Sequence, residues 1–574
     1  SWSTDAGMIG GTLGPESGYR VARGETVTSH LGWQVRLIRP LDFLVIADHA
    51  ENLGIADFIR RSDPLCLANE TCKRWHDLTK AGEGYQAFLE WLRSETGDQV
   101  NEPRMMESAW SSATELADRY YQPGAFTTLH GFEWTSHPGG NNLHRVVIFR
   151  DGRDRTSQVL PFSQFDSQDP EDLWDYLDGY EKKTGGEVLA LAHNGNFSNG
   201  MMFDTRTYSG KPLTRSYAEA RSRWEPLYEV TQGKGDGETH PLLSPDDEFA
   251  DFETTDRGNL KGKAVKTADM LPREYARSAL KEGLRQGAEL GVNPFKFGLV
   301  GSTDAHTALP TSREDNWFGK ASIIAPDAKR GEGVGIRGAK PELSLMNRDM
   351  GASGLAAVWA HENTRESIWD AMKRKEVYAT TGSRMLVRVF AGWNFSAEDL
   401  NRPDFVRQGY KRGVPMGGDL SAAPAGAAPS FLVRAWRDPD GANLDRIQLI
   451  KGWLDSEGQT QERVYDLAVS GGREIGADGR SRESVGNTVD IGDASYTNSV
   501  GAPMLFAHWV DPDFDPEQEA FYYVRVLEIP TPRWTAYDAK IFAVEMPDDT
   551  KMQVQDRAYT SPLWYTPGVP GAVR

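Results

Sequence analysis

Short apolar runs alternate with longer polar stretches from the start of the chain to about residue 385. The apolar runs have the length of buried strands; they are Phe43–Ala47, Phe126–Trp134, Arg145–Phe149, Val188–Ala192, Leu227–Thr231 and Phe297–Val300. The polar stretches have the length of helices; they are Ala68–Ser94, Asn101–Tyr121, Pro170–Lys183, Glu274–Leu290 and Arg365–Lys375. This alternation predicts an α/β fold around a mainly parallel sheet.

The pattern changes after about residue 386. Strand-like runs such as Phe431–Trp436, Ile447–Trp453 and Phe521–Ile529 are separated by turns rich in Gly, Pro and Asp, and helix signals are scarce. Such a pattern is typical of an antiparallel β-sandwich. We therefore expect three parts. These are an α/β barrel-like part over 1–385, a β-rich accessory domain over 386–545, and a tail over 546–574 that packs back on the barrel.

Carboxylate and imidazole side chains directly follow two of the apolar runs. GSTDAH places Asp304 and His306 two positions apart after one run, and FLVIADHA ends another run with Asp48 and His49. Residues two apart in an extended segment share a face, and such mixed oxygen and nitrogen donors bind divalent cations. Two of these motifs after buried strands predict a hydrolytic metal site at the C-terminal end of a parallel sheet or barrel.

Three more candidate ligands stand in similar contexts. GFEWTSH supplies Glu133 in a strand-like run, GGNNLHR supplies His144, and LALAHNGN ends a buried run with His193. Together with Asp304 and the two histidines named above, they make six potential metal ligands. Buried strand ends rarely collect so many ionisable groups without a cation. Their position just after the strands favours closure of the sheet into a barrel.

The composition excludes some classes of partner. The chain of 574 residues carries a net charge of −19 and 39% hydrophobic residues. This acidity, without a basic patch, argues against binding to nucleic acid or to an anionic membrane. The apolar runs are far shorter than the roughly 20 residues of a membrane span, so we expect no membrane insertion. The sequence predicts no particular oligomeric state.

Two cysteines, Cys66 and Cys72, lie six positions apart. They either close a small disulfide loop, which would indicate an oxidising compartment, or remain free thiols. Together with the acidic surface and the expectation that chain upstream of residue 1 is missing, the pair favours a periplasmic or secreted location. A cytoplasmic location is the alternative.

Several motifs, in this order along the chain, resemble those of the PHP (polymerase and histidinol phosphatase) metalloesterase superfamily: TDAG, ADHA, GFEW, AHN and STDAH. More closely, the chain resembles a bacterial PHP-like family catalogued as a domain of unknown function. That likeness extends through LGPESGYRVARGE, VTQGKGDGETHPLLSPDDEFADFE, GLAAVWAHENTRESIWDAMKRKEVYATTGSR and IPTPRWTAYDAK. The resemblance covers most of the chain and implies a distorted seven-stranded β/α barrel with two or three divalent metal ions.

The resemblance also implies roles for individual residues. Glu133 matches the carboxylate that bridges two metals, and His144 and His193 match the histidines on one of them. Asp304 matches a ligand of the other metal.

A third site is implied by matches at Asp5, His49 and His306. The superfamily also has a His-x-His pair, which would lie immediately upstream of Ser1. Either the chain is truncated there or one metal position is impaired, and we favour truncation because the match begins inside a motif.

These residues predict a metal-dependent hydrolase of small-molecule phosphoesters, which are triesters, diesters or monoesters. A hydroxide activated by the metals would be the nucleophile, and Asp304 or His306 could accept its proton. Lys234 could neutralise developing negative charge, and His240 could be a further ligand or a proton donor; the alternative for both is a salt bridge within a loop. The mixed donors favour manganese, with zinc or iron as alternatives.

Two other functions fit the same sequence. The site could hydrolyse sulfoesters, lactones or amides, because metal sites on barrels serve all of these reactions. In a different class, the β-rich half with its tryptophans could bind a carbohydrate or polymer without catalysis.

Overall fold

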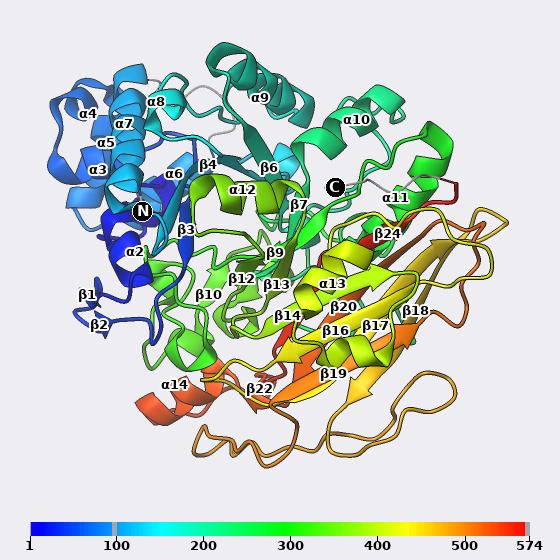
Figure 1. Ribbon diagram of the computed structural model, residues 1–574. Helices are drawn as coiled ribbons and strands as arrows, with labels where there is room; N and C mark the ends of the chain where they lie inside the picture. The colour runs from blue at the N-terminus through cyan, green and yellow to red at the C-terminus, as the bar shows by residue number, and fades with distance from the viewer. Residues whose placement is uncertain (1, 94–99, 101, 569–574) are drawn as a thin grey trace.

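The computed structural model describes residues 2–93, 100 and 102–568, and two of the expected helix ends, Ser94 and Asn101, lie outside the described residues. The fold is mixed, with 29% helix and 23% strand. Its helices lie mostly around the first sheet, and its last strands form layered sheets at the other end of the molecule (Figure 1). In the described part of the chain, no helix combines the length and the apolar character that crossing a bilayer requires.

The first sheet contains all six strands expected before residue 385. Its strands are β3 (Phe43–Ile46), β4 (Thr127–Trp134), β5 (Arg145–Phe149), β6 (Val188–His193), β7 (Leu227–Gln232), β8 (Gly235–Asp236) and β9 (Gly298–Gly301). They follow the order β3-β4-β5-β6-β7-β8, and β9 pairs with β7. The sheet curves as a half-barrel.

The expectation of a mainly parallel sheet is only half right. The β3–β4, β6–β7 and β7–β9 pairs are parallel, whereas β4–β5, β5–β6 and β7–β8 are antiparallel. Only residues 135–144 separate β4 from β5, which is too short for the helical crossover that parallel neighbours need. The strand β5 therefore returns as a hairpin partner of β4.

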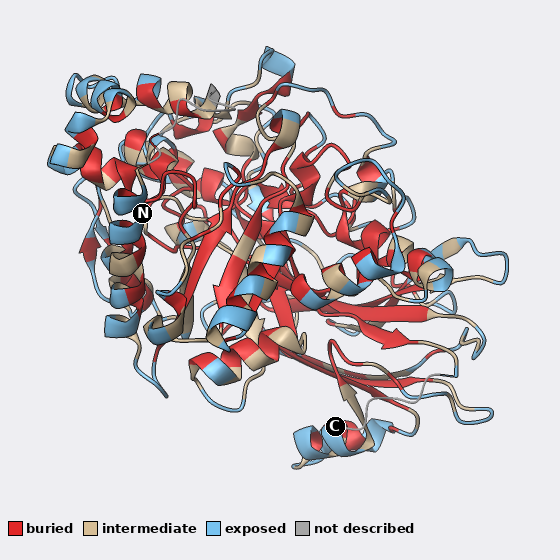
Figure 2. Ribbon diagram, turned by 90° about the horizontal axis from the view of Figure 1, so that it is seen from above, coloured by how far each residue is buried: buried red, intermediate tan, exposed pale blue. Residues whose placement is uncertain are grey.

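The two faces of this sheet bury different side chains, because successive strand residues point to opposite faces. Along β6, Val188 and Ala190 pack in the cluster under the outer helices, which also contains Trp174. The alternate residues Leu189 and Leu191 pack in a second cluster on the inner face. Figure 2 shows the strands buried between partly exposed helices.

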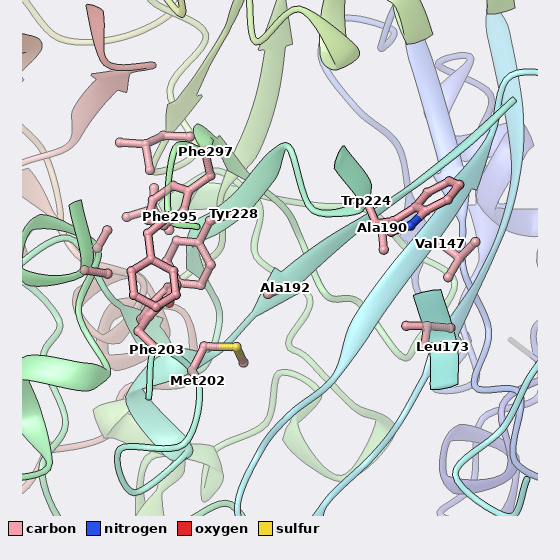
Figure 3. Close-up of a cluster of buried hydrophobic side chains, with 14 of the residues drawn as sticks. Val147, Leu173, Ala190, Ala192, Met202, Phe203, Trp224, Tyr228, Phe295 and Phe297 are labelled. Carbon is pink, nitrogen blue, oxygen red and sulfur yellow. The ribbon is translucent and has the colours of Figure 1, made fainter. Parts of the chain in front are cut away.

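Aromatic rings dominate one end of the outer cluster. Figure 3 shows Phe203, Tyr228, Phe295 and Phe297 close together, and the ring centroids of Phe203 and Phe297 are 5.4 Å apart. Close-packed rings of this kind fix the strands relative to the helices that cover them.

The helices agree with the expected ones, with one subdivision. The long stretch expected as one helix from residue 68 is interrupted and forms α5 and α6, preceded by α4. The α-helices are α1 (Thr4–Met8), α2 (Pro15–Ala22), α3 (Ile55–Arg61), α4 (Pro64–Ala68), α5 (Glu70–Lys80), α6 (Gly84–Arg93), α7 (Pro103–Tyr120), α8 (Arg153–Thr156), α9 (Pro170–Thr184), α10 (Arg215–Trp224), α11 (Ala276–Leu290), α12 (Arg365–Lys373), α13 (Phe405–Arg412) and α14 (Trp534–Phe542). Cys66 of α4 and Cys72 of α5 form a disulfide.

Two further sheets pack face to face. One has the order β12-β13-β23-β20-β17-β18, with β24 paired to β20, and the other has the order β15-β14-β16-β19. Their strands are β12 (Leu355–Val358), β13 (Val377–Thr380), β14 (Leu386–Gly392), β15 (Gly413–Pro415), β16 (Ser430–Trp436), β17 (Leu444–Leu454), β18 (Thr460–Val469), β19 (Met504–Val510), β20 (Ala520–Glu528), β23 (Arg557–Thr560) and β24 (Leu563–Tyr565). Three short pairs complete the sheets: β1 (Val27–Thr28) with β2 (Gln34–Val35), β10 (Val334–Ile336) with β11 (Leu345–Met346), and β21 (Thr531–Pro532) with β22 (Gln553–Val554).

Residues such as Val389 and Val433 on one of the packed sheets meet Leu449 and Val524 on the other in a single core. The larger sheet takes strands from all three of the expected parts of the chain, since β12 and β13 precede residue 385 and β23 and β24 follow residue 546. The three-part division itself stays a prediction.

A buried ionic network joins α11 to the larger of these two sheets. Asp247 accepts hydrogen bonds from Arg277 of α11 at 2.7 Å and from Arg525 of β20 at 2.7 Å. Both arginines also donate to Glu238, and both are fully buried. Burial alone would raise the pKa of Asp247, but Arg525 and Arg277 outweigh it and hold this pKa well below its usual value.

We expect Asp247→Asn to lower the free energy of unfolding by about 3 kcal/mol at pH 7, because it leaves buried arginine charge uncompensated. Since the pKa of Asp247 is lower in the folded state, its stabilisation is complete above the unfolded-state pKa of about 3.9 and declines as the pH falls below that value. Denaturant unfolding of both proteins between pH 7 and pH 3 measures the difference. The exposed Asp77, paired with Lys73, gives the control Asp77→Asn, which should change little. A difference that is independent of pH would contradict the assignment.

Candidate metal centre

Strand direction brings the candidate ligands to one edge of the first sheet. Glu133 lies near the end of β4, and His193 is the last residue of β6. The strand β5 runs the opposite way, so His144, just before its start, lies at the same edge. His49 follows β3 and bridges to Glu133, and the segment after β9 carries Asp304 and His306. The last candidate, Asp5, comes from α1.

The face of each strand also agrees. Leu191 and Leu227 belong to the inner cluster of the sheet. His193 and Glu229 stand two positions beyond them in the same strands, so their side chains share that inner face. The candidate ligands therefore meet inside the half-barrel.

Glu133, His144 and His193 form one group whose ligand atoms all lie within 4.8 Å of one another. Glu133 Oε1 is 2.8 Å from His144 Nδ1 and 3.2 Å from His193 Nε2. Both ring nitrogens of His144 and Nδ1 of His193 are buried, and none forms a hydrogen bond among the described residues. Buried ring nitrogens without a hydrogen-bond partner, next to a carboxylate that contacts two imidazoles, fit a cation held by all three groups.

Asp5, His49 and His306 form a second group of the same kind. His306 Nδ1 is 2.6 Å from Asp5 Oδ2, and His49 Nε2 is 3.5 Å from the same oxygen. His49 Nδ1 is also 3.5 Å from Glu133 Oε1. This histidine thus links the two groups into one continuous centre.

Asp304 stands beside the second group with its two oxygens in different roles. Oδ1 is 3.1 Å from His306 Nε2. Oδ2 accepts hydrogen bonds of 2.6 Å from Lys234 Nζ, Lys320 Nζ and Gln232 Nε2. The residue has a φ of 45°, in the left-handed region, which a non-glycine residue adopts at an energetic cost and often at functional sites.

Opposing effects set the protonation of the histidines. Burial lowers the pKa of His49, but Glu133 and Asp5 outweigh it and raise this pKa to about 10. The carboxylate of Glu133 likewise overcomes burial at His193 and raises its pKa to about 9. At His144 burial wins and lowers the pKa to about 3. Protons on two rings thus compensate the carboxylates here, and cations that bind must displace those protons.

All seven metal ligands expected from the sequence lie in or beside these two groups. Of the two other candidates, one contacts a ligand and one does not. Lys234 pairs with Asp304. His240 does not join the centre: its ring contacts Tyr275 at 5.4 Å, and its Nε2 is 3.8 Å from Asp256. No described contact connects His240 to either group of ligands.

Sequence reasoning missed three residues of the centre. Glu229 of β7 has Oε1 3.7 Å from His193 Nδ1, and its Oε2 accepts a hydrogen bond from Ser302 Oγ. A carboxylate inside a strand buried at every position was the available signal. Gln232 and Lys320 carried no comparable signal, because only the folded chain brings them to Asp304.

A cavity of about 560 Å³ opens on the centre. At one place it is lined by candidate ligands, among them Glu133, His193 and Asp304, and elsewhere by apolar side chains of the inner face, among them Ile148 and Leu191. Small molecules commonly bind in cavities that are mostly apolar with a few convergent polar groups.

We expect Glu229→Gln to weaken the binding of Mn²⁺ by at least about tenfold, because it removes a negative charge that lies 3.7 Å from His193 Nδ1 and increases the basicity of that ring. Isothermal titration calorimetry on metal-free protein measures the affinity. Glu187→Gln changes a carboxylate that is 54% exposed and serves as the control. Equal affinities of Glu229→Gln and the unsubstituted protein would exclude this role.

Comparisons with known proteins place the chain in a family. No curated protein matches it. The family described as a protein of unknown function (DUF3604) matches residues 1–567. Because this match covers almost the whole chain, the chain belongs to the DUF3604 family.

Proposed function

We propose that the protein is a metal-dependent hydrolase that cleaves phosphoester bonds. The observation that carries this proposal is the convergence of Glu133, His144 and His193 with a second ligand group on the inner face of one sheet. The resemblance of the sequence motifs to the PHP superfamily supports the same reaction class. It also supports the proposal that the half-barrel belongs to a distorted β/α barrel.

The donors present fit divalent cations. Imidazole and carboxylate ligands suit manganese, zinc and iron. His144 has buried ring nitrogens without a hydrogen-bond partner in the described part of the chain, and one of them could coordinate such an ion. Each of the two groups could hold one cation, and Asp304 could complete a third site. Bound cations would supply a nucleophilic hydroxide near neutral pH and would polarise the phosphoryl oxygen.

The side chains of the centre would fix the positions of the two sites and transfer protons. Glu133 belongs to the first group and also lies 3.5 Å from His49 of the second, so it can hold both sites at a fixed separation. His306, within 3.1 Å of Asp304, can accept a proton and share it with that carboxylate. We assign proton transfer to these two residues rather than to His240, whose described contacts lie elsewhere.

We also propose that the protein works in an oxidising compartment, the periplasm or the extracellular space. The disulfide between Cys66 and Cys72 supports this location, because disulfides rarely persist in a reducing cytosol.

Removal of metal should abolish hydrolysis of an aryl phosphoester, and Mn²⁺ or Zn²⁺ should restore it. We expect Glu133→Gln to lower kcat/KM by at least about 100-fold, because it removes the charge shared by both ligand groups. Glu115, which is 57% exposed on α7, provides the control Glu115→Gln.

A panel of sulfoesters, lactones and amides, assayed with the same preparations, tests the alternative chemistry. Turnover of an amide with none of any phosphoester would overturn the proposal. Full activity of Glu133→Gln would exclude the assigned centre.

A further inference from the structure

Two lysines share one oxygen of the candidate ligand Asp304. Nζ of Lys234 and Nζ of Lys320 each donate to Oδ2 at 2.6 Å. The two side chains are 7% and 10% exposed, so both ammonium groups are largely removed from water. Two like charges beside a single oxygen repel each other unless further negative charge is near.

The chain holds both lysines firmly in place. Gln232 donates to Asp304 Oδ2 and accepts a hydrogen bond from the backbone N–H of Lys234, each at 2.6 Å. The backbone N–H of His306 donates to the carbonyl oxygen of Lys320 at 2.7 Å. The lysines are therefore fixed to the same segments that carry the candidate ligands.

The ammonium groups retain capacity to donate. An ammonium has three N–H donors. Lys234 Nζ donates to Asp304 Oδ2, and Lys320 Nζ donates to Oδ2 and to the carbonyl oxygen of Asp304. Among the described residues, Asp304 is the carboxylate with which both lysines pair. The unused donors lie next to Asp304, which lines the cavity on the centre.

The charge balance favours an anion as that acceptor. Asp304 pairs with both ammonium groups, and the carboxylates of Asp5, Glu133 and Glu229 belong to the same centre. Over these four carboxylates and two ammonium groups, two divalent cations at the ligand groups would turn the summed charge positive. A positive, largely buried site attracts anionic ligands strongly, because few water molecules screen it.

We propose that Lys234 and Lys320 form an anion-binding pair that selects esters of a tetrahedral oxyanion with at least one ionised oxygen over neutral esters. This inference rests on the proposed hydrolase function. It favours phosphomonoesters and phosphodiesters, or the sulfate monoesters of the same shape, over phosphotriesters. Each ammonium can donate to a substrate oxygen through an N–H that Asp304 does not use, while Asp304 stays in place.

Binding of inorganic phosphate to the Mn²⁺-loaded protein tests the pair without catalysis. Lys320→Gln and Lys234→Gln each keep a hydrogen-bond donor near Asp304 but remove the charge. We expect each to raise the Kd for phosphate at least about tenfold in isothermal titration calorimetry, the effect of losing one charge-assisted hydrogen bond. Lys320→Arg should stay within about threefold of the unsubstituted protein, and so should Lys73→Gln at a residue that is 55% exposed. Inorganic sulfate, titrated in parallel, separates the two kinds of oxyanion.

Kinetics give a second, independent measurement. The glutamine variants should lower kcat/KM for an aryl phosphomonoester at least about tenfold and leave an aryl phosphotriester nearly unaffected. A role limited to positioning Asp304 would instead lower both activities together, together with the bound Mn²⁺ measured by elemental analysis.

The outcomes separate the two proposals. An unchanged Kd for phosphate in both glutamine variants, with Mn²⁺ content intact, would overturn the anion pair. Phosphate binding that depends on the lysines, in a protein that hydrolyses no ester, would support the pair and refute the hydrolase. If the Lys320 variants do not fold, Lys234→Gln carries the same expectation.

Discussion

Negative charge buried at one edge of the first sheet determines which side chains can surround it. Glu133, Glu229 and Asp304 lie on strands or loops that meet there, away from most of the solvent. Carboxylates in such a place must be compensated by protonated histidines, by lysines or by cations. The positions of the neighbouring side chains, down to the lysines on Asp304, follow from that requirement.

The sheet meets this requirement through its direction and its two-residue period. Parallel strands bring their C-terminal ends together, and the reversed β5 adds His144 at its start. Alternation places apolar residues such as Leu191 and Leu227 behind the ligands on the same face. The metal ligands thus stand on an apolar base, which limits the movement of the side chains that hold the charge.

The strands and the ligands that follow them were readable from the sequence because both signals are local. An apolar run that ends in a histidine, as at His193, can be recognised within a short stretch of sequence. Glu229 was missed because it lies within a strand rather than at its end. Lys320 was missed because it stands 16 positions after Asp304, with no local pattern that links the two. The pairing of β13 with β23, which are separated by some 180 positions, depends on long-range contacts that no local pattern encodes. The reversal of β5 follows instead from its short connection to β4, a local signal that the expectation of a mainly parallel sheet did not use.

The ionic network around Asp247 has a consequence for how the molecule comes apart. Arg277 belongs to the first half of the sequence, whereas Arg525 belongs to the last strands. A fragment that ended near residue 385 would keep Arg277, Glu238 and Asp247 but would lose Arg525. It would also expose the face of α11 that the later strands cover. The two halves of the chain are therefore coupled in melting, and heat should disrupt them in a single cooperative step rather than one after the other.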